Sequence, residues 1–217
     1  MTMRYTRISL AALTAATAAV LGVTTALAAI TWTVRPGGSV TAVSGQVVIK
    51  DVPTGSLFEC PTSTLKAALK NGSGLPGTNI GSVSAFTFPP LKPMAKACMG
   101  PLSITFKLTM THLPMTLNAT SYSANTGTTT GMITGIHATV VGPSCEMVFD
   151  GTAASKDNGS LQVSYVNSTH KLTYLPGGNL HEYKVTGCGF LPGFANGHKV
   201  TITGAGKLTP AQTITSP

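Results

Sequence analysis

The chain has 217 residues and a formal net charge of +8, with 14 Lys or Arg residues and 6 Asp or Glu residues. Charged residues make up 9% of the sequence, against about 25% in typical soluble domains. This composition excludes a coiled coil, which needs charged residues and leucine at heptad spacing, and it excludes a charged disordered tail.

Residues 1–28 have the pattern of a Sec-type secretory signal peptide. Arg4 and Arg7 form a basic segment, residues 8–23 form an apolar run, and Ala26-Leu27-Ala28 supplies the small residues that signal peptidase requires. The apolar run is short for a bilayer span and contains several threonines, which favours cleavage over a membrane anchor. The sequence therefore predicts a signal helix that is removed, a secreted (extracellular) domain over residues 29–217, and no membrane attachment afterwards.

After residue 29, polar and apolar residues alternate along most of the chain. The segment 103–110 alternates over its whole length, which is typical of a half-buried strand. Sequences rich in Gly, Pro and Asn separate such runs and predict turns. In chain order the predicted strands are Thr31–Arg35, Gln46–Lys50, Ile80–Phe88, Ser103–Met110, Met115–Tyr122, Thr130–Val141, Glu146–Asp150, Leu161–Tyr165, His170–Leu175, His181–Thr186, Lys199–Thr203 and Gln212–Ser216.

Many short strands with regular turns predict an all-β fold, either an antiparallel β-sandwich or a barrel-like domain. The segment 63–70 contains Leu65, Ala67, Ala68 and Leu69, and it fits a short amphipathic helix as well as a strand. Gly and Pro are spread evenly and leave no linker, which favours one domain over two lobes.

Four cysteines follow the signal segment: Cys60, Cys98, Cys145 and Cys188. An even number in an exported protein predicts two disulfides, and three pairings are open. Each half of the chain holds a Cys-to-Cys loop of similar length with a Gly/Asn/Ser-rich turn inside it. This similarity between the two halves favours the pairing Cys60–Cys98 and Cys145–Cys188, and it predicts a pseudo-repeat of residues 29–125 and 126–217.

No catalytic motif is present: Gly-x-Ser-x-Gly, His-Glu-x-x-His, the phosphate loop and the dinucleotide fingerprint are all missing from the sequence. The sequence therefore predicts no catalytic residue and no cofactor. Since it also has no Cys-x-x-Cys or Cys-x-x-His pair, it predicts no metal site. A weak candidate surface site consists of Glu146, Asp150 and Glu182, because paired carboxylates are the machinery of glycoside hydrolysis. Solvated surface charge is the favoured interpretation of these three residues.

Other residue types indicate partners only in outline. The lysines are scattered singly, which predicts no nucleic-acid partner. His137 lies in an apolar run and is predicted to be hydrogen-bonded within a sheet rather than to bind a ligand. Exposed aromatic rings bind sugars in many β-domains. The candidates are Trp32, Tyr122, Tyr165, Tyr174 and Tyr183, with a structural cross-strand pair as the alternative for Tyr165 and Tyr174.

Four segments resemble a group of secreted actinobacterial proteins that have no assigned activity. They are Trp32–Ser39 (WTVRPGGS), Asn118–Tyr122 (NATSY), Gly177–Cys188 (GGNLHEYKVTGC) and Gln212–Pro217 (QTITSP). The resemblance implies bacterial export and an all-β body, and it implies nothing about a ligand.

These observations predict a secreted, non-catalytic β-rich protein of the cell envelope or extracellular space that acts by binding or as a structural component. The expected partner is a cell-wall polymer, another extracellular polymer or a small apolar ligand. Two alternatives stay open: a secreted hydrolase that uses the carboxylate site, and a carrier that holds a small apolar ligand inside a barrel.

Overall fold

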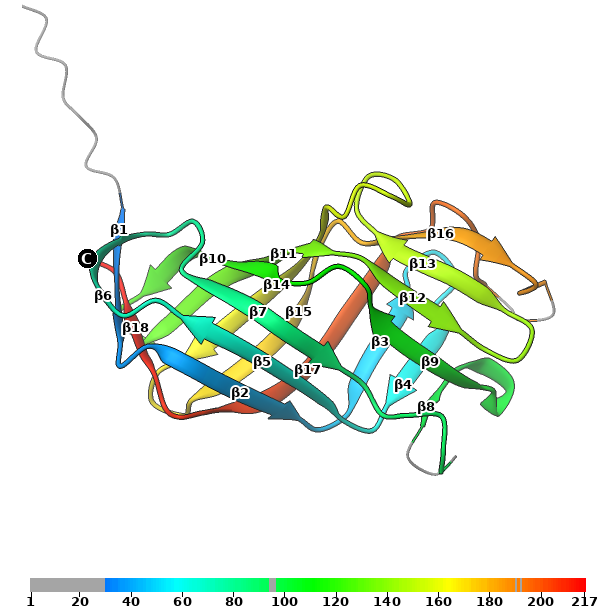
Figure 1. The fold of residues 1–217 in the computed structure, drawn as a ribbon, viewed down its shortest axis with the longest axis horizontal. Coiled ribbons are helices and arrows are strands. Elements are labelled where there is room, and N and C mark those ends of the chain that lie inside the picture. Colours follow the sequence, from blue (N-terminus) through cyan, green and yellow to red (C-terminus); the bar gives the residue numbers. More distant parts are fainter. Residues whose placement is uncertain (1–29, 94–96, 190, 192) are drawn as a thin grey trace, which may run out of the picture.

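A computed structural model describes residues 30–93, 97–189, 191 and 193–217; the predicted signal helix lies outside them. The described chain is all-β, and the strands pair antiparallel. They run around two closed rings that share one long strand, β17 (Val200–Thr209) (Figure 1). None of the described residues form a helix with the length and apolarity needed to span a bilayer.

The first ring runs in the order β17-β2-β5-β7-β10-β11-β14-β15 and returns to β17. Residues 206–209 of β17 pair with β2, and residues 204–207 pair with β15, so the second half of β17 closes this ring. The other strands of the first ring are β2 (Gly38–Ser44), β5 (Ser63–Leu69), β7 (Gly81–Thr87), β10 (Met115–Ser123), β11 (Thr128–Ile136), β14 (Gly159–Val166) and β15 (Lys171–Gly178).

The second ring runs in the order β17-β3-β4-β8-β9-β12-β13-β16. Residues 200–203 of β17 pair with β3, and an isolated bridge between His181 and Lys199 returns β16 to the start of β17. A 3-10 turn at Pro101–Ser103 precedes β9. The other strands of the second ring are β3 (Val47–Asp51), β4 (Leu57–Cys60), β8 (Cys98–Met99), β9 (Thr105–Met110), β12 (Ala138–Val141), β13 (Glu146–Asp150) and β16 (His181–Thr186).

A three-stranded sheet lies across the outer end of the first ring (Figure 1). It consists of β18 (Thr213–Thr215), β1 (Thr31–Arg35) and β6 (Gly72–Pro76), in that order. Trp32 is 2% exposed and is buried in this cap, together with Val34 and Ile214. The Ser216 hydroxyl donates a hydrogen bond of 2.8 Å to the Thr31 carbonyl.

Side chains fill the inside of both rings. In the second ring the Phe58 ring packs edge-on against Phe106, with centroids 4.7 Å apart, and stacks on Phe194 at 4.6 Å. The first ring is lined by aliphatic side chains such as Leu65 and Ile133, and it encloses an apolar cavity of about 50 Å³.

The predicted strands are confirmed with shifts of their ends, and the largest shift is in β17, which continues to Thr209 although the prediction ended at Thr203. The predicted strand 130–141 is divided at His137 into β11 and β12. The segment 63–70 is strand β5 and not a helix, because every second residue from Ser63 to Leu69 is buried. Of the two architectures left open, the pairings favour the barrel-like one, because the strands return to β17. Four strands were not predicted: β2, β4, β6 and β8.

The two halves of the chain repeat one strand order. In the first ring, β2-β5-β7-β10 come from the first half and β11-β14-β15-β17 from the second; in the second ring, β3-β4-β8-β9 are followed by β12-β13-β16-β17. In the first half of the chain, β10 is the last strand contributed to the first ring and β9 is the last contributed to the second. In the second half of the chain, the single strand β17 is the last strand in both rings. The pseudo-repeat of residues 29–125 and 126–217 stays a prediction, and this order supports it.

Both disulfides have the predicted pairing, Cys60–Cys98 and Cys145–Cys188, and both lie in the second ring.

We expect replacement of both Cys145 and Cys188 by Ala to lower the free energy of unfolding by about 4 kcal/mol, because the bridge closes a long loop in the unfolded chain. Urea unfolding of the oxidised protein measures this difference. A loss below about 1 kcal/mol would contradict the expectation.

Gly206 is the first residue of β17 that pairs with β2, after the pairing with β3 has ended at Thr203. A Cβ atom at this position would lie 2.5 Å from the carbonyl oxygen of Val43 and 2.8 Å from the backbone nitrogen of Ser44. We expect Gly206→Ala to lower the free energy of unfolding by about 1–3 kcal/mol, because neighbouring backbone must move. Gly45→Ala is the control, since nothing lies within 4 Å of its added Cβ; equal losses in both variants would refute the close approach.

Candidate functional site

The three carboxylates of the predicted surface site do not converge. Glu146 is exposed at the start of β13, whereas Asp150 and Glu182 are both fully buried. In the β13–β16 pair Glu182 lies opposite Phe149, and Asp150 lies opposite His181. Because neighbouring residues of a strand point to opposite faces, Asp150 and Glu182 lie on opposite faces of the sheet. Two of the three residues are thus internal, each in a separate cluster.

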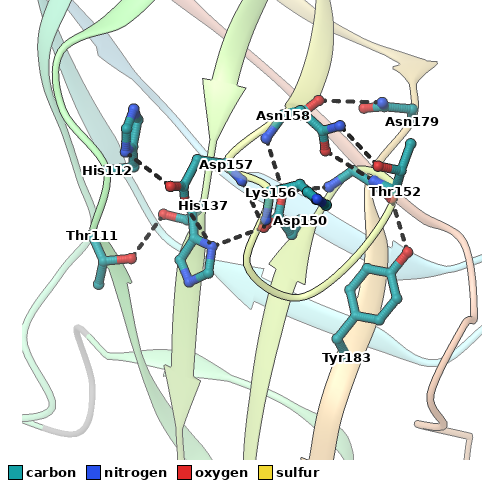
Figure 2. A network of polar contacts seen from close by, with 11 residues as sticks. Thr111, His112, His137, Asp150, Thr152, Lys156, Asp157, Asn158, Asn179 and Tyr183 are labelled. Atoms are coloured by element: carbon teal, nitrogen blue, oxygen red, sulfur yellow. Dashed lines mark hydrogen bonds and ion pairs between the residues drawn. The ribbon is translucent and has the colours of Figure 1, made fainter.

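Asp150 is the centre of the first cluster (Figure 2). Its Oδ1 accepts the backbone N–H groups of Gly151 and Asn158 at 2.6 and 3.1 Å. Its Oδ2 accepts those of Lys156 and Asp157 at 3.2 and 3.1 Å. The carboxylate therefore organises the loop 151–158, which carries the chain from the second ring back to the first.

Two histidines complete this cluster. His137 Nδ1 lies 2.9 Å from Asp150 Oδ2 and 3.1 Å from Asp157 Oδ1. His112 Nδ1 lies 3.4 Å from Asp157 Oδ2 at the exposed edge (Figure 2). His137 is hydrogen-bonded as predicted, although it lies between two strands rather than within one.

The hydrogen bonds decide the charge of Asp150. Burial acts to raise the pKa of its carboxyl, but the hydrogen bonds from Gly151, His137, Asp157 and Asn158 outweigh burial and lower the pKa below its ordinary value of 3.8. The five hydrogen bonds to the two oxygens of Asp150 fill the acceptor capacity of its carboxylate. This cluster is a satisfied structural network.

The second cluster comprises Asp51, Glu182 and His198. Asp51 Oδ1 accepts hydrogen bonds from the backbone N–H and the hydroxyl of Thr54, and Asp51 Oδ2 lies 2.8 Å from His198 Nδ1. Glu182 Oε2 accepts the backbone N–H of Ala195 at 3.0 Å. One potential metal-ligand atom from each of Asp51, Glu182 and His198 lies within 4.8 Å of the corresponding atoms of the other two residues. The same is true of His137, Asp150 and Asp157. Either group therefore has the spacing to hold a metal ion.

The pKa of Glu182 is shifted in the opposite direction to that of Asp150. Burial raises the pKa of Glu182 to about 8, and the neighbouring Asp51 carboxylate adds to the rise. Its Oε1 is buried and has no hydrogen-bond partner among the described residues. This oxygen is the poorly satisfied polar atom of the second cluster.

Three of the five aromatic residues considered for sugar binding belong to the interior, whereas Tyr122 and Tyr183 are half-buried. Trp32, Tyr165 and Tyr174 are 2%, 4% and 2% exposed, so none offers a ring face to a ligand at the surface. The Tyr165 hydroxyl donates to the Gln212 carbonyl at 2.8 Å, which ties β14 to the segment before β18. Tyr174 stacks at an angle on Phe86, with centroids 5.3 Å apart. Both tyrosines are structural, but they are not paired across the strands, because Tyr165 lies opposite Leu172 and Tyr174 lies opposite Val163.

Sequence reasoning missed both clusters because their members are far apart along the chain. The signal in the sequence is weak: each of Asp51 and Asp150 ends a predicted strand or follows it directly, and a turn sequence comes next. Nothing in the spacing shows that His198 reaches Asp51 or that His137 reaches Asp150. Those contacts depend on the closure of the second ring and on the crossing between the rings.

Comparison with known proteins adds no identification: no family model, no curated protein sequence and no solved structure matches this chain.

We expect Asp150→Asn to lower the free energy of unfolding at neutral pH by about 3 kcal/mol, because an amide nitrogen would face the backbone donors of the loop. The pKa of Asp150 is lowered in the folded state, so its contribution is present above about pH 4 and is lost as the pH falls further. The difference between wild type and variant should therefore shrink at about pH 3. Urea unfolding at both pH values measures it.

Asp157→Asn is the matched control, since this side chain is 40% exposed and its carboxylate lies at ion-pair distance from the His112 and His137 rings. We expect a loss below about 1 kcal/mol for it. Similar losses in the two variants would show that Asp150 does not organise the loop.

Proposed function

We propose that this protein is secreted and acts without catalysis, by binding an extracellular polymer or as a structural component of the cell envelope. The observation that carries the proposal is the filled interior of both rings. The first ring encloses about 50 Å³ between side chains such as Val40, Leu117 and Val163. An engineered cavity that binds benzene measures about 150 Å³, so a cargo of that size would have to displace core side chains.

The positions of the carboxylates also favour a non-catalytic role. A glycoside hydrolase needs two carboxyl groups facing each other across a groove, about 5 Å or about 6.5–9.5 Å apart. Glu146 is exposed, whereas Asp150 and Glu182 are buried on opposite faces of the β13–β16 pair. Asp150 in addition holds a loop through backbone hydrogen bonds.

Secretion is supported by two features of different kinds. Residues 1–28 have the pattern of an export signal, and two buried disulfides are typical of proteins that fold in an oxidising compartment. The resemblance to secreted actinobacterial proteins supports a bacterial host.

Binding would take place on the outer surface, where hollows of ligand size are present. Two of them, of about 320 and 300 Å³, lie on either side of the segment Thr87–Pro90. A third, of about 480 Å³, lies beside the cap and is lined by Arg35, His170 and Gln212. Small-ligand pockets usually measure about 300–1,000 Å³. Leu113, which is 43% exposed, borders one of the hollows at Thr87–Pro90 and offers apolar contact there.

The proposal predicts a bare, processed monomer or oligomer in native mass spectrometry of the protein purified from culture supernatant. Each chain should have the mass of residues 29–217 less four hydrogens, and reduction should restore those hydrogens. The same sample should co-sediment with the purified cell-wall polymer of its host. Non-covalent mass that is lost on denaturation would instead support the carrier. A bare protein that turns over a polysaccharide would support the hydrolase.

A further inference from the structure

The buried group of Asp51, Glu182 and His198 lies where the second ring closes. Asp51 is the last residue of β3, Glu182 is the second residue of β16, and His198 lies two residues before β17. The backbone N–H of Glu182 donates to the His198 carbonyl at 2.8 Å, and that of Gly197 donates to the Glu182 carbonyl at 2.7 Å. Two strands and the segment before β17 therefore hold the three side chains together.

With both carboxyl groups ionised, negative charge would exceed positive charge in this group. The side chains of Asp51 and Glu182 are fully buried, and two adjacent buried carboxylates repel each other. Among the described residues, the cationic group within ion-pair distance of Asp51 is His198, at 2.8 Å and 29% exposed. One histidine can balance at most one of the two charges.

The second oxygen of Glu182 points to a missing ligand. Oε2 is bonded to the Ala195 N–H, whereas Oε1 is buried without a hydrogen-bond partner in the described chain. Asp150, in the other cluster, receives five hydrogen bonds on its two oxygens. Buried carboxylate oxygens are normally satisfied by donors or by a cation, and no donor from the described residues reaches this one.

We propose that Asp51, Glu182 and His198 bind one divalent cation of the Zn²⁺ or Mn²⁺ kind, which closes the second ring. Two carboxylates and one imidazole are a ligand set that such cations accept, and a double positive charge would neutralise both acids. The site is independent of the surface-binding role proposed above, because its two acids are buried. It is therefore a structural site.

Further oxygen atoms lie next to the three side chains. The Gly193 carbonyl lies 3.0 Å from His198 Nδ1, and the Thr54 hydroxyl is bonded to Asp51. These oxygens would orient the primary ligands, as the hydrogen-bonded neighbours of metal ligands do in other proteins. The competing explanation is a protonated Glu182 without any cation, which agrees with its raised pKa.

Calorimetric titration of the oxidised, chelator-treated protein with Zn²⁺ and, separately, with Mn²⁺ tests the site. We expect one bound ion per chain and a higher melting temperature with the ion present. Glu182→Gln keeps the size of the side chain and an acceptor for Ala195, but we expect it to lower the affinity at least about tenfold. Without cation its melting temperature should stay close to that of wild type, because the amide has nearly the shape of the carboxyl group and keeps the acceptor for the Ala195 N–H.

His137→Gln is the control, since it alters the other histidine–carboxylate cluster and should leave the affinity unchanged. If Glu182→Gln fails to fold, ¹⁵N spectra of the histidine rings in wild type replace it: Zn²⁺ should shift the resonances of His198 and leave those of His137 in place. Absence of stoichiometric binding at millimolar cation, unchanged affinity in Glu182→Gln, or shifts confined to His137 would each overturn the proposal. A protonated Glu182 would then account for the site.

Discussion

The hydrogen bonds along both edges of β17 hold the two rings together. Its first half pairs with β3 and, through the bridge at Lys199, meets β16; its second half pairs with β2 and β15. In the first half of the chain, the positions equivalent to the two halves of β17 are occupied by two separate strands, β9 and β10, with residues 111–114 between them. One junction is thus a continuous strand and the other is interrupted. A shift of β17 by one residue would turn the interior side chains of both rings outward together.

Both histidine–carboxylate clusters lie at junctions of the double ring. Asp150 holds the loop by which the chain leaves the second ring for the first, and Asp51 and Glu182 lie where β16 returns to β17. A protein with 6 acidic residues uses three of them inside, beside strand ends, rather than on its surface. The scarcity of charge in the composition therefore does not mean that charge is unimportant to the fold.

Local patterns in the sequence predicted most of the strands but not which strands pair with one another. Alternation over 103–110 predicted β9 because a half-buried strand has a period of two. The segment 63–70 was ambiguous because small residues such as Ala67 and Ala68 fit either period. Two strands, β8 and β4, are too short to show a period. Which strands pair, and which acids become buried, depends on contacts between residues far apart in the chain, and a single sequence does not display them.

The hydrogen bond between Ser216 and Thr31 brings the two extremes of the described chain to one place. That place is the cap of the first ring, at the far end from the disulfides (Figure 1). Any polypeptide joined before Thr31 or after Ser216 must therefore leave from the same end. A tether at either position would hold the molecule by its cap and turn the disulfide-bonded ring outward, and a short linker between them would make the backbone circular without altering a strand.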